Sequence, residues 1–160
     1  MTAATRFGKP LPAGGTIGVA AAASPYDSRS DVLRGIEWWE KLGYRIKLAE
    51  GAWDRDDYVA GDPRRRGEDL NALSADPEVD VVQALQGGFG SAQAIPCLDF
   101  DLIAANPKPL VGYSDITALH VAIYGLPLGH AKHLAALPLG VACTLDADAK
   151  TLTVDEPALR

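Results

Sequence analysis

The sequence predicts an α/β fold in which a parallel sheet carries helices on both faces. Short apolar runs, at residues 16–22 and 79–85, alternate with longer amphipathic or polar segments such as residues 31–42 and 63–74. Strands that alternate with helices of this length are typical of a parallel sheet with helical crossovers. The length of 160 residues, 48% of them hydrophobic, suits one domain.

The first half of the chain predicts a strand, a helix and a second strand. Residues 16–22 are small and apolar, as in a strand covered on both faces. A helix is predicted over residues 31–42, because apolar side chains recur there at three- and four-residue steps. This stripe consists of Val32, Ile36, Trp39 and Leu42. Ser30 and Asp27 are both candidates for the N-cap, and residues 44–48 alternate like a strand with one wetter face.

The second half continues the alternation. Residues 50–62 form a polar, turn-rich loop, in which Trp53 and Tyr58 either pin the loop to the domain or contact a ligand. Asp62 is predicted as the N-cap and Pro63 as the first residue of a helix that runs to about residue 74. A strand, two short helical segments and a last strand are predicted at residues 79–85, 91–95, 98–103 and 109–111.

A glycine-rich turn at residues 86–91 directly follows one predicted strand. Gly87, Gly88 and Gly90 allow the backbone to approach a ligand closely and to adopt positive φ. Because the turn leads into a helix N-terminus, it is a candidate cradle for an anion or an oxyanion. The spacing is neither G-x-G-x-x-G nor a P-loop, so nucleotide binding is only weakly indicated. The alternative is a tight turn without a ligand.

A second turn, Gly112-Tyr113-Ser114, lies between the last strand and a helix that opens at Asp115. A serine on such a turn stands at the carboxyl edge of the sheet, where the following N–H groups point toward it. That arrangement suits a nucleophile beside an oxyanion site; the alternative is that Ser114 only caps the helix. Both turns leave the carboxyl ends of strands, so we expect them to meet on one edge of the sheet, where α/β folds bind ligands.

Charge and composition exclude several classes of protein. The net charge of -6 and the pI near 4.9 argue against nucleic-acid binding, and the only basic cluster, residues 64–66, is soon followed by acidic residues. The N-terminus lacks the layout of a signal peptide, and no apolar run reaches transmembrane length. We therefore expect a cytoplasmic protein with no nucleic-acid or membrane partner. His120, His130 and His133 lack a completing ligand set, so neither a metal nor another cofactor is predicted.

Several motifs resemble the LD-carboxypeptidases, a serine peptidase family that includes microcin-immunity peptidases. Over residues 16–124 the resemblance rests on the segments 87–90, 98–103 and 106–109 and on the run Gly112-Tyr113-Ser114-Asp115-Ile116-Thr117-Ala118-Leu119. Residues 125–130, 137–140 and 145–147 are similar to the extreme carboxyl end of the same family. A middle region of the family separates these two matches, and we interpret the junction near Tyr124 and Gly125 as an internal deletion.

The resemblance implies two domains. Residues 1–124 would form a class I amidotransferase-like α/β domain that carries the nucleophile. Residues 125–160 would be a short β-rich remnant of the second domain and would carry the catalytic histidine motif. Strands at residues 141–154 would lack some of their partners, and exposed strand edges favour a homodimer or aggregation.

The resemblance also implies a Ser-His-Glu triad that hydrolyses the bond between an L-centre and a terminal D-residue, as in a murein tetrapeptide. Ser114 matches the nucleophile and His130 the general base, whereas no glutamate of this chain matches the third member. The oxyanion donors would be the N–H groups of Gly88 and Asp115. The other predicted oxyanion- and substrate-binding residues are Gly87, Phe89 and Tyr113.

Two alternatives to the hydrolase remain open. Loss of the orienting carboxylate costs a triad roughly 10⁴ in turnover, so the chain could instead be a non-catalytic remnant that binds murein peptides. A nucleotide-binding, doubly wound domain rests on fold analogy alone. The predicted partner is a small peptide in the first two cases and a mononucleotide in the third.

Overall fold

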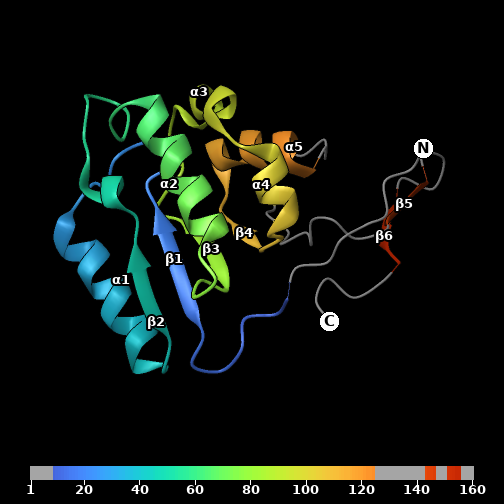
Figure 1. The fold of residues 1–160 in the computed structure, drawn as a ribbon, viewed down its shortest axis with the longest axis horizontal. Coiled ribbons are helices and arrows are strands. Elements are labelled where there is room, and N and C mark those ends of the chain that lie inside the picture. The colour runs from blue at the N-terminus through green and yellow to red at the C-terminus, as the bar shows by residue number, and fades with distance from the viewer. Residues whose placement is uncertain (1–8, 125–142, 147–150, 156–160) are drawn as a thin grey trace.

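A four-stranded parallel sheet with the strand order β2-β1-β3-β4 forms the centre of the domain (Figure 1). The computed structural model describes residues 9–124, 143–146 and 151–155. The strands are β1 (Thr16–Ala20), β2 (Arg45–Leu48), β3 (Val81–Ala84) and β4 (Leu110–Val111), and each pairing is parallel. A separate antiparallel pair joins β5 (Cys143–Asp146) to β6 (Thr151–Val154). The predicted parallel sheet and the predicted strands near the carboxyl end are confirmed.

Helices occupy both faces of the sheet. They are α1 (Arg29–Lys41), α2 (Pro63–Ala75), α3 (Ser91–Ala94), α4 (Phe100–Ala105) and α5 (Thr117–Tyr124), with 3-10 turns η1 (Glu50–Trp53), η2 (Ile95–Cys97) and η3 (Ser114–Ile116). On one face, Trp39 of α1 packs against Ile17 and Val19. On the other, Leu73 of α2 joins a core with Ala20 of β1. Successive residues of β1 thus serve opposite layers, and both layers are covered.

Two of the local helix signals act as predicted. The Asp62 carboxylate accepts a hydrogen bond from the N–H of Arg64 at 2.7 Å, and Pro63 is the first residue of α2. Leu70 and Leu73 of the same helix are buried. None of the helices in the described part of the chain is long and apolar enough to cross a bilayer.

Two expectations for α1 are wrong. The helix begins at Arg29, and its N-cap is Ser28 rather than Ser30 or Asp27, with no side-chain cap hydrogen bond. The hydroxyls of Ser28 and Ser30 bond each other at 2.8 Å, so the oxygen that could cap the helix has another partner. Leu42 lies after the last helical turn and is 53% exposed, so the partly buried stripe of Val32, Ile36 and Trp39 ends before it.

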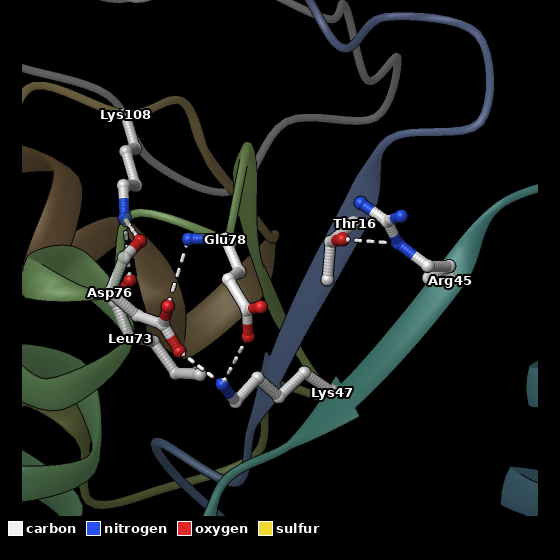
Figure 2. A network of polar contacts seen from close by, with 7 residues as sticks. All are labelled: Thr16, Arg45, Lys47, Leu73, Asp76, Glu78 and Lys108. Atoms are coloured by element: carbon white, nitrogen blue, oxygen red, sulfur yellow. Dashed lines mark hydrogen bonds and ion pairs between the residues drawn. The ribbon is translucent and has the colours of Figure 1, made fainter.

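Charged side chains in the segments ahead of β3 and β4 contact one another and Lys47 of β2 (Figure 2). Lys47 Nζ lies 2.5 Å from Asp76 Oδ2 and 3.3 Å from Glu78 Oε2. Lys108 Nζ donates to the carbonyl oxygens of Leu73, at 2.9 Å, and Asp76. The hydrogen bond with Asp76 raises the pKa of Lys47, and the same contact lowers the pKa of Asp76. These contacts tie β2 and α2 to the segments that lead into β3 and β4.

Candidate functional site

Loops from all four strand carboxyl ends meet around one cavity of about 510 Å³. Its wall includes Ser24 after β1, Arg55 after β2, Gly87 and Gly88 after β3, and Tyr113 and Ser114 after β4. The sequence predicts that the loops after β3 and β4 meet, and the structure brings them together. It also adds the loop after β1, which the sequence does not assign to the site, and the loop after β2, where ligand contact is one of two alternatives that the sequence leaves open.

Ser114 occupies a strained turn. Its φ is +59°, in the left-handed region that a residue with a Cβ rarely adopts. Such conformations cost on the order of 1–3 kcal/mol and cluster at active sites. The N-cap of η3 is Tyr113, and Ser114 is the first residue of the turn itself. The backbone therefore presents the Ser114 side chain from a sharp bend at the cavity wall.

The glycine turn packs directly on the Ser114 turn. A Cβ on Gly87 would lie 2.9 Å from Ser114 Cβ and 2.9 Å from the Tyr113 carbonyl oxygen. The same position is 3.4 Å from the amide nitrogen of Asp115, so that N–H lies beside the glycine turn. Gly88 has a φ of +100°, and a Cβ there would come within 2.3 Å of Ser24 Oγ. Only glycine allows this approach at both positions.

Ser24 fixes the glycine turn from the other side. Its hydroxyl donates to the Tyr58 carbonyl oxygen at 2.7 Å and accepts from the N–H of Phe89 at 3.0 Å. Its own N–H donates to the Gly87 carbonyl oxygen at 3.1 Å. No local sequence pattern indicates these contacts, which span up to 65 residues.

Phe89, Tyr113 and Asp115, which the sequence predicts as site residues, differ in exposure and in hydrogen bonding. The Phe89 N–H is engaged by Ser24, and its ring is 60% exposed. Tyr113 is 63% exposed on the cavity wall. The Asp115 carboxylate accepts from the N–H of Ser91 at 2.7 Å, and the Ser91 hydroxyl donates to the Asp115 carbonyl oxygen at 2.5 Å. The Asp115 side chain thus ties the Ser114 turn to α3 and leaves its backbone N–H beside the glycine turn.

A second hollow of about 540 Å³ adjoins the first at Gly88 and Ser114. Its apolar wall includes Ile95, Ala118 and Val121. The first cavity instead carries charged and polar side chains such as Arg55. Ser114 therefore lies where a polar and an apolar binding surface meet, as suits a group that acts in the middle of an extended ligand.

Aromatic and cationic side chains stack in the loop after β2. The Tyr26 and Trp53 rings lie edge to face at 5.3 Å between centroids, so Trp53 pins the loop to the domain. The Arg55 guanidinium lies 5.2 Å from the Tyr26 ring centroid and also donates to the Tyr26 carbonyl oxygen. Tyr58 is 75% exposed and lines the cavity. The loop holds Arg55 in place while leaving most of its five donors for other partners.

Of the three histidines, only His120 lies within the described residues. His120 of α5 is buried, and its Nε2 has no hydrogen-bond partner among the described residues. Burial lowers the pKa of His120, whose side chain packs inside the domain. His130 and His133 lie outside the described residues. Within residues 9–124, 143–146 and 151–155, no group of three metal-ligating side chains comes together.

The fold and this edge of the sheet define an α/β protein whose site lies in loops at the carboxyl ends of parallel strands. The family described as LD-carboxypeptidase N-terminal domain matches residues 17–131. The chain therefore belongs to the LD-carboxypeptidase family, whose curated members bear the names of carboxypeptidases, a class of hydrolases.

Named relatives agree with this assignment. The "Probable murein peptide carboxypeptidase" of Bacillus subtilis is 40% identical over 116 residues, which cover 72% of this chain and 36% of the relative. The murein tetrapeptide carboxypeptidase of Pseudomonas aeruginosa is 36% identical over 132 residues, or 80% of this chain and 42% of the relative. The chain thus spans well under half the length of these relatives.

Solved structures show the same fold. The microcin C7 self-immunity protein MccF, known from Escherichia coli, was solved in complex with aspartyl sulfamoyl adenosine. It superposes with a TM-score of 0.72 at 32% identity, over 74% of this chain and 36% of that one. The match covers the α/β sheet and supports the fold assigned above.

Proposed function

We propose that this chain carries the nucleophile of a serine-type LD-carboxypeptidase, with Ser114 as the attacking group. The observation that carries the proposal is the strained Ser114 turn packed against the glycine turn at the carboxyl edge of the sheet. The substrate would be a small peptide of the murein tetrapeptide type that ends in a D-amino acid. The names of the murein peptide relatives support this substrate class.

The proposed reaction is acyl transfer through Ser114. Its Oγ attacks the carbonyl carbon of the L-to-D bond while a general base takes the hydroxyl proton. The N–H groups of Gly88 and Asp115 would stabilise the oxyanion that forms. The C–N bond then breaks, the terminal D-amino acid leaves with the proton, and water hydrolyses the acyl-enzyme. We propose His130 as the base, with Gly87, Phe89 and Tyr113 as the other residues in contact with substrate.

Arg55 is suited to bind the terminal carboxylate of such a peptide. It lines the same cavity as Ser114, and its guanidinium is oriented by the Tyr26 carbonyl and ring. None of the carboxylates in the described ranges forms an ion pair with Arg55. A guanidinium pairs with a carboxylate through two parallel hydrogen bonds. A carboxypeptidase needs this kind of recognition to select a chain end.

A second candidate is a binding protein that keeps the pocket without cleaving peptides. The carboxylates in the described walls of the two cavities belong to Asp27, Asp57 and Asp115, and the glutamate that the family resemblance implies is not among them. Without that carboxylate, turnover would fall roughly 10⁴-fold while the binding groups stay in place. In this case Arg55 and the glycine turn would hold the peptide carboxylate and the carbonyl oxygen.

Hydrolysis and binding are separated by two measurements on the same peptide. Release of D-alanine from an L-lysyl-D-alanine peptide should occur with the wild-type chain and disappear in Ser114→Ala. Equal rates for the two proteins would rule out Ser114 as the nucleophile. Calorimetric binding of the tetrapeptide without D-alanine release would favour the binding protein, and absence of binding would exclude it.

We further propose the two-part organisation into residues 1–124 and residues 125–160, with the second part supplying His130. The family resemblance supports a cytoplasmic role in the recycling of peptidoglycan peptides. The outer edges of β5 and β6, which pair with no other strand of the described residues, suit a homodimer. Sedimentation of the purified chain at several concentrations would test that association.

A further inference from the structure

A buried guanidinium that the proposed chemistry does not use lies beneath the site. Arg66 of α2 is 1% exposed. Its Nη2 donates to Gln93 Oε1 at 2.7 Å, and its Nη1 donates to the Ala23 carbonyl oxygen at 3.4 Å. Its Nε is buried and has no hydrogen-bond partner among the described residues. A side chain held this way needs an explanation beyond packing.

Arg66 connects three of the four loops that form the cavity. The Ala23 oxygen also accepts from the N–H of Ala60 at 2.8 Å, so the loops after β1 and β2 meet at this guanidinium. The loop after β3 lies against it, because a Cβ on Gly90 would be 3.0 Å from Nη1. Gln93, which accepts from Arg66, also donates its N–H to the Gly90 carbonyl oxygen at 3.0 Å. Loss of Arg66 would loosen the glycine turn.

The charge of Arg66 has no close counterion in the described part of the chain, where none of the ion pairs includes it. Asp62 and Asp115 act on it only at longer range. An unpaired buried charge costs folding free energy. A negative charge that forms nearby would recover part of that cost, because interactions between charges are stronger in a low dielectric. Asp115, which feels this field, directly follows Ser114.

We infer that Arg66 is a positioning residue of the site. It holds the glycine turn against the Ser114 turn, and its positive charge favours the negative charge that develops on the substrate oxygen. The inference rests on the proposed function, since it takes Ser114 as the nucleophile. Arg66 acts through the backbone of the glycine turn and through its field, without touching the substrate.

The sharpest test is Gln93→Glu. This variant keeps the oxygen that accepts from Arg66 but adds a carboxylate that neutralises the guanidinium, and Gln93 is exposed enough to tolerate the change. The probe is a fluorophosphonate. Ser114 Oγ forms a bond to phosphorus, the P–F bond breaks, fluoride leaves, and the hydroxyl proton passes to the base or to water. We expect Gln93→Glu to lower the rate constant of Ser114 labelling about tenfold, with an unchanged or higher thermal midpoint. A merely structural Arg66 would leave that rate constant unchanged.

Replacements of Arg66 itself complete the test. Arg66→Gln should slow labelling by about a hundredfold, and Arg66→Lys, which keeps the charge, should recover much of that loss. Arg65→Gln is the matched control, because Arg65 lies on the same helix and pairs with the exposed Glu50 at 2.9 Å. It should label at the wild-type rate. Circular dichroism gives the folded fraction of each variant.

The outcomes distinguish the two proposals. Wild-type labelling rates in Gln93→Glu, or in a folded Arg66→Gln variant, would overturn the inference alone. If Arg66→Gln does not fold, Gln93→Glu still decides the question. Absence of labelling in the wild-type chain would overturn the proposed function, and the inference with it.

Discussion

The two edges of one sheet use polar side chains in opposite ways. At the amino end of β3, Asp76 and Glu78 pair with Lys47 of β2, and these contacts bring neighbouring segments together (Figure 2). At the carboxyl edge, Arg55 lines a cavity and pairs with none of the described carboxylates, and Ser114 lies in a strained turn beside it. Paired charges hold the sheet, whereas the cavity presents a guanidinium and a serine on a strained turn.

Backbone strain is concentrated at the carboxyl edge. Among the described residues other than glycine, Asp57 and Ser114 are those with positive φ, and both line the cavity. Each such conformation costs on the order of 1–3 kcal/mol and persists only where the surroundings impose it. Ser24 and Gly87 supply those surroundings here. The contrast between the edges therefore extends from the side chains to the backbone.

The largest expected effect comes from Gly88→Ala. The new Cβ would lie 2.3 Å from Ser24 Oγ on a backbone with a φ of +100°, so the turn must move and the Ser24 contact with Phe89 must break. We expect fluorophosphonate labelling of Ser114 to fall about a hundredfold. The control is Gly35→Ala, where no atom lies within 4 Å of the new Cβ. It should stabilise α1 by about 0.5–1 kcal/mol and leave labelling unchanged.

The next effect tests whether Arg55 selects a chain end. The wild-type chain should bind a peptide that ends in D-alanine about tenfold more tightly than the same peptide as its carboxamide. Arg55→Gln should remove that preference, while Arg64→Gln, at an exposed position of α2, should keep it. Calorimetry of the wild-type chain and Arg55→Gln, each with the acid and the carboxamide peptide, gives the coupling energy between Arg55 and the peptide carboxylate. A preference that survives in Arg55→Gln would place carboxylate recognition elsewhere.

A smaller effect measures the strain at Ser114. Ser114→Gly removes the Cβ that disfavours a φ of +59°, whereas Ser114→Ala keeps it. The free energy of unfolding, measured by urea denaturation, should therefore be about 1 kcal/mol larger for the glycine variant than for the alanine variant. Asp57→Gly should show the same gain, since Asp57 has a φ of +52°, and should still label at Ser114. An alanine variant as stable as the glycine variant would argue against strain.

The smallest effect belongs to the amino edge. The pKa of Asp76 lies below its usual 3.8 and that of Lys47 above its usual 10.5. The Asp76 contribution to stability is thus present above pH 3.8 and lost as the pH falls through its folded pKa. The Lys47 contribution is present below pH 10.5 and lost as the pH rises through its own. Asp76→Asn should flatten the acid limb of the urea-midpoint profile and leave Ser114 labelling unchanged; a loss of labelling would mean that the two edges are coupled.

Local sequence patterns were sufficient for the sheet and for two of its four site loops. Apolar runs and glycines mark β1, β3 and the turn at Gly87, because these features depend on neighbours in the chain. The prediction that the glycine turn and Ser114 share an edge followed from parallel topology alone and is confirmed. The cap of α1 was wrong, because Ser28 and Ser30 bond each other.

Long-range contacts explain the rest. The sequence predicts only a turn around Ser24, a loop around Arg55 and a charged helix start around Arg66. Their importance comes from partners distant in the sequence, such as Phe89 for Ser24 and Gln93 for Arg66. No periodicity or spacing encodes such pairs. The backbone strain at Ser114 also cannot be predicted from the sequence, because it follows from how the turn is packed.

The central claim is that the Ser114 turn presents a nucleophile to an oxyanion site, and peptide mapping after fluorophosphonate treatment tests it most directly. The account predicts a single adduct on Ser114 in the wild-type chain and none in Ser114→Ala. An unmodified Ser114, or an adduct that forms equally on other exposed serines such as Ser30, would contradict it.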